Sequence, residues 1–367
     1  MMTEESIYQL SLTRIPDIGS ILTKQLIDYF GSASAVFKAR KKELAAVEGI
    51  GEVRATQIKK FSDHDSSEQE LKKIEQHQLT LLFITDEQYP QRLKNCSDPP
   101  LVLFFKGNKS LNPSRIISVI GSRNATDYGR TVTEQLIKAL QPYDVMIVSG
   151  LAHGIDAIAH RSALQQQLPT IGVMAHGFKT IYPHVHRSLA REMIDQGGLL
   201  TEFWWDALPD KHHFPQRNRI VAGISDATVV IETAVKGGSM ITADLAFEYN
   251  RDVFAVPGRI YDQRSSGCLQ LIAQNKATAF TSPEQIINAL GWLEPKKKKN
   301  LQKKLFPELS SEEQIIVSIL TEHHQIHVDE LYLKTQLPSS AMASAILNLE
   351  LQNIIIQLPG KRYELSV

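Results

Sequence analysis

Apolar and polar positions along residues 116–290 follow a repeating order, in which short apolar runs alternate with longer amphipathic stretches. The runs are five or six residues long and stand at 116–121, 145–149, 170–174, 198–202, 227–232 and 252–256. Runs that are apolar on both faces are typical of parallel strands covered by helices on both sides. We therefore expect an α/β fold built on an extended Rossmann-like, doubly wound and mainly parallel sheet.

The residues before this segment show a different pattern. Helical apolar periodicity runs through 6–61 and is interrupted by Gly-containing turns at Ile15–Gly19 and Val47–Gly51, which resemble helix-hairpin-helix turns. A small helical bundle that serves only packing or protein contact is the alternative, because Gly-rich turns between helices are common. The polar stretch 62–69 is typical of a connection. Apolar runs at 79–84 and 101–105 predict two strands that extend the sheet.

The residues after it predict a second small unit. Four consecutive lysines, Lys296–Lys299, indicate a charged and solvated linker. Beyond them the pattern predicts helices and then two short strands, which is the order of a winged helix. We expect the following organisation: helical domain 1–75, α/β domain 76–292, linker 293–309 and winged-helix domain 310–367.

Charge and composition narrow the functional classes. The chain carries 40 basic and 40 acidic residues, so a nucleic-acid site must come from a local cluster. Residues 301–367 hold 5 basic and 8 acidic residues, which predicts a protein-contact or regulatory tail rather than a DNA reader. No apolar stretch approaches the ~20 residues of a membrane span, and no leader pattern begins the chain, so we expect a cytoplasmic protein. Cys96 and Cys268 give no disulfide framework.

Small and basic residues follow the predicted strands. Ligands of open α/β sheets bind outside the carboxyl ends of the strands, so these residues are the candidate site. Their types, cations and Gly or Ser turns, suit the binding of several phosphates. The candidates are Ser122, Arg123, Lys179, Arg217, Arg219, Lys236, Gly237, Gly238 and Ser239.

The motifs of nucleotide-dependent enzymes are missing. Gly121 opens a sequence without the Gly-x-Gly-x-x-Gly fingerprint, and the chain has no Walker A sequence. The histidine pairs at 184–186 and 212–213 lack a partner at metal-ligand spacing. We therefore expect no catalytic residue, no cofactor and no metal. The aromatic residues Phe178, Tyr182 and Phe214 stand near the candidate cations and favour an unpaired nucleic-acid strand.

Several sequence blocks resemble the DNA-processing protein A (DprA/Smf) family of bacteria. They are Val119–Arg123, Ser149–Asp156, Ile181–Pro183, Phe214–Gly223, Gly238–Ala243 and Ala255–Gly258. The resemblance implies binding of single-stranded DNA in a basic pocket, a homodimer, loading of the RecA recombinase during natural transformation, and no catalysis. Within these blocks, Arg123, Arg217 and Arg219 are the pocket residues that the resemblance supports best.

The resemblance also implies a dimer surface, to which we assign apolar residues of two helices: Met240, Leu245, Leu269 and Ile272. Some positions depart from the family pattern. Lys179, His186 and Gly237 stand where a carboxylate, an asparagine and a serine are usual, and the changes at Leu269, Asn275 and Lys276 weaken any inherited detail of the dimer surface.

A nucleotide-processing enzyme is the alternative from another class. Rossmann-like phosphoribohydrolases also carry a Gly-Gly turn before a helix, and Glu232 would then be catalytic. They lack the Arg-Asn-Arg block that this chain has at 217–219.

Overall fold

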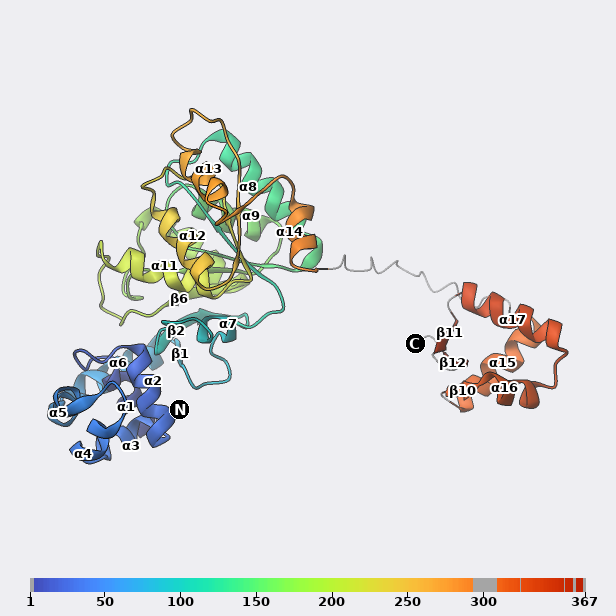
Figure 1. The fold of residues 1–367 in the computed structure, drawn as a ribbon, viewed down its shortest axis with the longest axis horizontal. Coiled ribbons are helices and arrows are strands. Elements are labelled where there is room, and N and C mark those ends of the chain that lie inside the picture. Colours follow the sequence, from blue (N-terminus) through green and yellow to red (C-terminus); the bar gives the residue numbers. More distant parts are fainter. Residues whose placement is uncertain (1–2, 293–308, 324, 353, 359–360, 366–367) are drawn as a thin grey trace. The chain divides into compact units, whose positions relative to one another are not determined.

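The computed structural model describes residues 3–292, 309–323, 325–352, 354–358 and 361–365. Contacts divide the chain into two compact units, Met1–Pro295 and Lys296–Val367. Figure 1 shows the larger unit as a sheet with helices around it and a helical N-terminal part, and the smaller unit as a compact group of helices and short strands. The expected linker at 293–309 lies outside the described residues, apart from Leu309.

A nine-stranded sheet forms the centre of the larger unit, in the order β1-β2-β6-β5-β4-β3-β7-β8-β9. All neighbouring pairs from β6 to β9 are parallel, whereas β2 is antiparallel to both β1 and β6. The strands are β1 (Thr80–Phe83), β2 (Val102–Gly107), β3 (Ile116–Ile120), β4 (Met146–Ser149), β5 (Thr170–Val173), β6 (Gly198–Thr201), β7 (Ala227–Val230), β8 (Asp252–Ala255) and β9 (Thr278–Ala279). The predicted mainly parallel sheet is confirmed, and only β9 was missed, because two residues make no apolar run.

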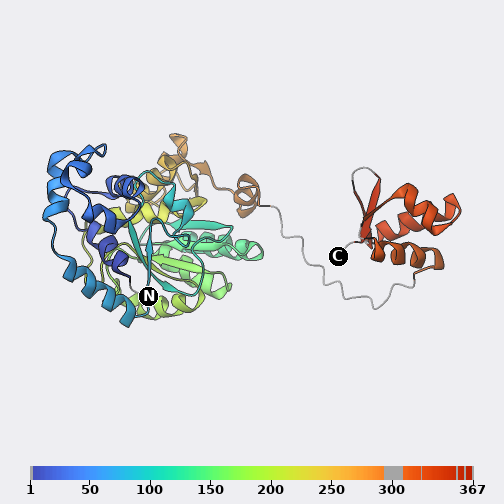
Figure 2. The ribbon, with the colours of Figure 1, turned by 90° about the horizontal axis from the view of Figure 1, so that it is seen from below.

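Helices cover both faces of this sheet, as Figure 2 shows. Side chains alternate along each strand, so Ile117 and Val119 pack on one face and Ile116 and Ile120 on the other. One core contains residues of α8 (Asp127–Leu140), α9 (Ile155–Gln165) and α14 (Pro283–Ala289). The opposite core contains residues of α11 (His213–Gly223), α12 (Gly238–Glu248) and α13 (Ser266–Ala273). A third cluster holds residues of α10 (Arg187–Gln196).

The direction in which strands are added reverses beside β3. From β3 the chain proceeds through β4 and β5 to β6 on one side, and then returns to β7, β8 and β9 on the other side. In an open α/β sheet the point where the order reverses leaves a crevice at the carboxyl ends of the strands. The crevice here is expected between the ends of β3 and β7.

Six helices form the N-terminal part of the larger unit: α1 (Glu4–Leu12), α2 (Ser20–Phe30), α3 (Ala33–Lys38), α4 (Lys41–Ala46), α5 (Gly51–Lys60) and α6 (His64–Gln76). Their apolar side chains belong to the same core as β1, β2 and α11. The expectation of a connection at 62–69 is wrong, because these residues begin α6. The Asp63 side chain accepts from Ser66 N–H at 3.2 Å, and Leu71 and Ile74 are buried, so the cap and an apolar stripe stabilise a mostly polar helix.

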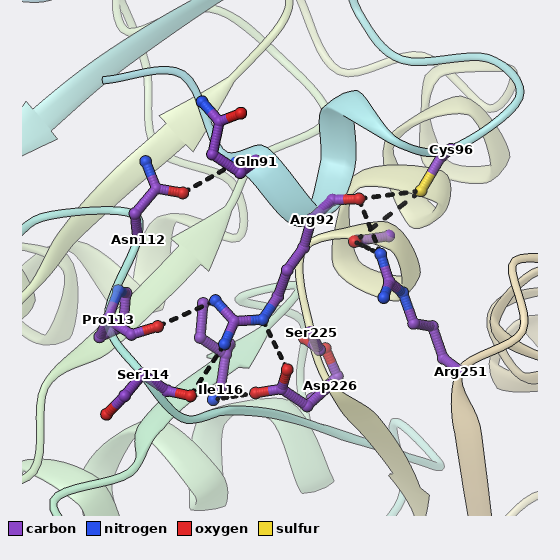
Figure 3. Close-up of polar contacts among 12 residues, drawn as sticks. Gln91, Arg92, Cys96, Asn112, Pro113, Ser114, Ile116, Ser225, Asp226 and Arg251 are labelled. Carbon is purple, nitrogen blue, oxygen red and sulfur yellow. Dashed lines mark hydrogen bonds and ion pairs between the residues drawn. The ribbon is translucent and has the colours of Figure 1, made fainter. Parts of the chain in front are cut away.

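A polar cluster joins the short helix α7 (Gln91–Lys94) to the amino ends of β3 and β7 (Figure 3). Arg92 contacts Asp226 at 2.6 Å and donates to the carbonyls of Pro113 and Ser114, both at 2.9 Å. The second carboxylate oxygen of Asp226 accepts from Ile116 N–H at 2.8 Å. The cluster fixes the two central strands at the end opposite to the crevice.

The smaller unit is a winged helix with the predicted helices and the two predicted strands, and it also has a strand between its first two helices that was not predicted. It contains α15 (Ser311–Glu322), β10 (Gln325–His327), α16 (Val328–Thr335), α17 (Ser339–Leu351), β11 (Ile355–Leu358) and β12 (Arg362–Leu365), and its strands pair in the order β10-β12-β11. Its core includes Ile316, Leu331, Leu349 and Tyr363. In the described parts of both units, no helix is long and apolar enough to cross a membrane.

Candidate nucleic-acid site

A cavity of about 450 Å³ lies at the expected crevice. The segments after β3, β4 and β7 contribute to its wall, together with one side of α11 and the start of α12. Of the predicted site residues, the cavity brings together Ser122, Arg123, Arg217, Gly237, Gly238 and Ser239. Asp156, Phe214, Asn218 and Thr233 also line it.

Two glycines allow the turn after β3 to pack against the start of α9. Gly121 lies so close to Ile155 that a Cβ atom there would stand 2.6 Å from its Cγ1. Gly154 adopts φ +74°, a conformation that favours glycine, beside the backbone of Ser122 and Arg123. The Ser122 carbonyl accepts from Ile155 N–H at 3.1 Å. Backbone packing therefore fixes the direction in which Arg123 leaves the sheet.

Two buried charged residues hold the Gly150 peptide from both sides. The Asp156 carboxylate accepts from the N–H groups of Gly150 at 3.1 Å and Ala152 at 3.3 Å. The Arg217 guanidinium donates to the carbonyls of Gly150 and Val173. Arg217 is only 4% exposed, so it forms part of the wall rather than a free cation at the mouth.

Burial opposes the charges of both residues. Desolvation raises the pKa of Asp156, and the nearby Arg217 guanidinium acts in the opposite direction. Desolvation also lowers the pKa of Arg217 to about 10, while Asp156 counteracts the shift. Each residue therefore stabilises the charged form of the other, and at neutral pH Arg217 remains a cation beside the cavity.

Arg123 and two aromatic rings form a row along the rim. The Arg123 guanidinium is exposed and lies 5.3 Å from the ring centroid of Phe214. The Tyr182 ring, 44% exposed, lies 6.1 Å from the Phe214 ring. Arg123 and Phe214 line the cavity, and all three residues line a shallow hollow just outside it. His176 Nε2 accepts from Tyr182 N–H at 3.1 Å and so helps to place this ring.

The start of α12 supplies hydrogen-bond donors to the cavity. Gly237 is the N-cap and contributes no side chain, so the first N–H groups of the helix lack a side-chain cap. A Cβ atom added at Gly238 would meet no atom within 4 Å, which leaves room for a ligand. Ser239 Oγ donates to Thr233 Oγ1 at 2.7 Å. Lys236 is exposed beside this turn but does not line the cavity.

Two other predicted cations lie elsewhere. Arg219 forms an ion pair with Glu202 and donates to the Asp98 carbonyl, in a separate cleft on the other side of α11. Lys179 contacts Asp206 at 2.7 Å and does not line the cavity. The part of either residue in DNA binding stays a prediction.

Helical geometry explains the separation of the two arginines. Phe214, Arg217, Asn218 and Val221 line the cavity, and their spacing of three and four places them on one side of α11. Arg219 is two positions from Arg217 and therefore points away by about 200°. Sequence reasoning missed Asn218 and Thr233, although the helical period contained the signal for Asn218.

Glu232 has a structural environment. It is 4% exposed, and both carboxylate oxygens accept from Thr126, one from its N–H at 3.0 Å and one from its hydroxyl. Thr126 is the N-cap of α8, so the carboxylate stabilises a helix start. Glu232 does not line the cavity, which disfavours the alternative in which it is catalytic.

The expected dimer residues differ in exposure. Met240 is 8% exposed and belongs to the core that includes α12. Leu245, Leu269 and Ile272 are partly exposed. Their role in self-association stays a prediction.

Comparisons with known proteins cover all three parts of the chain. The family model for DNA recombination-mediator protein A matches residues 80–291. A helix-hairpin-helix model matches residues 10–71, and a model for the DprA winged-helix domain matches residues 303–361. The matched segments correspond to the N-terminal helices, the α/β part and the smaller unit.

Individual relatives agree with these matches. The chain is 31% identical to protein Smf of Synechocystis over 99% of this chain and 100% of that protein. It is 43% identical to the DNA processing protein DprA of Bacillus subtilis over 56% of this chain and 70% of that protein.

Two solved structures are also similar. The crystal structure of DprA from Streptococcus pneumoniae has a TM-score of 0.67 at 32% identity and covers 78% of this chain and 98% of that chain. DprA from Helicobacter pylori, described with its single-stranded DNA binding mode, has a TM-score of 0.53 at 31% identity and covers 58% of this chain and 95% of that chain. The resemblance seen in the sequence is therefore confirmed. The chain belongs to the DNA recombination-mediator protein A family, whose members are named DprA or Smf.

Proposed function

We propose that this protein binds single-stranded DNA in the cavity between β3 and β7. The observation that carries the proposal is the Arg123–Phe214 pair, at 5.3 Å, on the rim of a cavity that also contains the start of α12. A cation and helix-start N–H groups attract phosphates, and the aromatic face next to them stacks on an unpaired base. A similar protein, DprA of Helicobacter pylori, is known with its single-stranded DNA binding mode, and this likeness supports the proposal.

Each part of the site has a separate task in this proposal. The N–H groups of Gly238 and Ser239 and the Arg123 guanidinium bind phosphate oxygens. Phe214 and Tyr182 stack on bases without reading their sequence. Arg217 holds the loop after β4 in place and adds a positive potential from within the wall. Duplex DNA presents no free base faces to the row of rings, so single strands are preferred.

We also propose that the bound strand is delivered to the RecA recombinase during natural transformation. The family description as a recombination mediator supports this role. A homodimer would place two cavities on one particle and raise avidity through effective concentration. The protein acts in the cytoplasm and without catalysis in this proposal, and neither Glu232 nor Asp156 is required for chemistry.

Salt-dependent binding tests the site directly. Arg123→Ala should weaken binding to a labelled single strand and lower the slope of log affinity against log salt by about 0.7. Arg191→Ala removes an exposed arginine on α10, outside the cavity lining, and should leave both quantities unchanged. Equal affinity and slope in the wild type and a folded Arg123→Ala protein would contradict the proposal.

A further inference from the structure

The separate cleft that contains Arg219 has a volume of about 730 Å³ and lies between the N-terminal helices and the α/β part. Its wall includes the turn before α2, the residues before β2, the loop after β6 and the outer side of α11. We call it the interdomain cleft. Its volume is within the range of small-ligand sites, about 300–1,000 Å³. Nothing proposed above uses it.

A buried carboxylate in the wall has an unused acceptor. The Glu202 side chain is 9% exposed. Its Oε2 forms the ion pair with Arg219 and accepts a hydrogen bond from the amide of Gln216 at 3.1 Å. Its Oε1 is buried and has no hydrogen-bond partner among the described residues. Because Arg219 already balances the charge, the group requires an N–H donor rather than another cation. Glu202 itself lines the cleft, so its carboxylate lies beside any ligand bound there.

Planar side chains stand next to this carboxylate. The rings of Phe203 and His213 are stacked at a centroid distance of 4.2 Å, and both line the cleft together with Trp204. His213 Nδ1 is a second buried polar atom without a partner among the described residues. A planar ligand that carries both donors and acceptors would satisfy these atoms and pack against the rings.

Another part of the cleft wall, the start of α2, suits an anion. Gly19 is the N-cap of α2 and provides no side-chain cap, and Gly19 and Ser20 both line the cleft. The 11 residues of α2 give its start the partial positive charge of a helix N-terminus. A ligand that places a base beside Glu202 and a phosphate beside Ser20 would be a nucleotide.

The cleft is next to the cavity of the proposed function. The two hollows share Pro215, and α11 separates them along the rest of their length. A strand that crosses the start of α11 can therefore place one nucleotide in each.

We propose that the interdomain cleft is a second subsite for the same DNA strand, in which Glu202 accepts an amino N–H of the base. The inference rests on the proposed function, because the strand must first bind in the cavity. Adenine, cytosine and guanine carry an exocyclic amino group, whereas thymine presents carbonyl oxygens on both sides of its single N–H. The other contacts proposed for the strand do not depend on base sequence. This subsite would therefore add a preference against thymine.

Homopolymers of cytosine and thymine test the preference, since the two pyrimidines differ at the amino position. Wild-type protein should bind oligo(dC) about tenfold more tightly than oligo(dT) of the same length, near physiological salt. Glu202→Gln retains the size of the side chain but offers an amide, and it should bring this ratio close to one. Arg123→Ala should weaken binding to both strands and leave the ratio intact. Thermal unfolding followed by tryptophan fluorescence checks that each variant is folded.

A second variant tests the phosphate end without disturbing the fold. Ser20→Glu adds a carboxylate in the first turn of α2, where it stabilises the helix but repels a phosphate. It should weaken binding to both homopolymers about threefold, a loss that high salt reduces. Ser311→Glu makes the same change at the first position of α15 and should have no such effect.

The outcomes separate the two proposals. If wild-type protein binds neither homopolymer, the proposed function fails. If it binds both equally, or if Glu202→Gln retains the full preference while Arg123→Ala weakens binding, the cleft is not a base subsite although the proposed function stands.

Discussion

Replacement of Arg217 is the sharpest test of the architecture of the site. Its guanidinium is buried and donates to two carbonyls, those of Gly150 and Val173, close to the buried carboxylate of Asp156. Arg217→Met keeps much of the apolar volume but leaves both carbonyls without this donor and the carboxylate without its nearby cation. Each unsatisfied carbonyl costs about 1–3 kcal/mol, and the Asp156 carboxylate, which forms no direct ion pair with Arg217, also loses the favourable influence of this cation. These costs overlap, so we expect a loss of about 4 kcal/mol in the free energy of unfolding.

Urea unfolding measured by tryptophan fluorescence can isolate this loss. The chain has three tryptophans, Trp204, Trp205 and Trp292, and all belong to the larger unit, so the signal does not report on the winged helix. Arg191→Met is the matched control, because an exposed arginine on α10 should change stability by no more than about 0.5 kcal/mol.

A double-mutant cycle with Asp156→Asn completes the test. If the two charges stabilise each other, the double variant should be less damaged than the sum of the single variants, by about 1–2 kcal/mol. A loss below about 1 kcal/mol for Arg217→Met, together with additive effects, would refute the argument that the buried pair supports the loop after β4.

Three further predictions concern the ring row, a buried histidine and the tail. Phe214→Ala should weaken binding of single strands by about 1–3 kcal/mol, because a stacking surface is lost. The slope of log affinity against log salt should stay the same, because no phosphate contact is lost. A reduced slope would contradict this. Burial lowers the pKa of His160 to about 3 in the folded protein. When the pH is below 6.5, the ordinary pKa of histidine, the unfolded state therefore binds a proton that the folded state does not. When the pH falls from 7.0 to 5.5, the free energy of unfolding measured in urea should therefore decrease by about 1.3 kcal/mol more in the wild type than in His160→Asn. Equal decreases would refute this prediction. A chain that ends at Asn300 should keep its single-strand affinity near physiological salt, because residues 301–367 carry 5 basic and 8 acidic residues; loss of most of that affinity in a folded protein would show that the tail reads DNA.

Local sequence patterns predicted most of the fold. Apolar runs located β3 to β8, because strands buried on both faces tolerate few polar residues. The winged helix followed from the order of its elements, helices and then two short strands. The error at 62–69 arose because composition alone cannot show that Asp63 caps a helix with buried residues every three or four positions.

The candidate site was predicted less completely than the fold. Proximity to a strand end correctly placed Ser122, Arg123 and the Gly237–Ser239 turn at one cavity. It did not show that Arg217 would be buried against carbonyls or that Arg219 would pair with Glu202. Side-chain partners of this kind come from segments far apart in sequence, and no single-chain periodicity encodes them.

The two faces of α11 restrict how this segment can change during evolution. Phe214 and Arg217 face the cavity, whereas Gln216 and Arg219 face the interdomain cleft. Insertion or deletion of one residue between Phe214 and Arg219 would rotate the rest of the helix by about 100° relative to its start. The residues after that point would then no longer face the cavity or the cleft that they face now. Relatives that retain this helix should therefore vary by substitution and show gaps only beyond its ends, even where the loops around it differ in length.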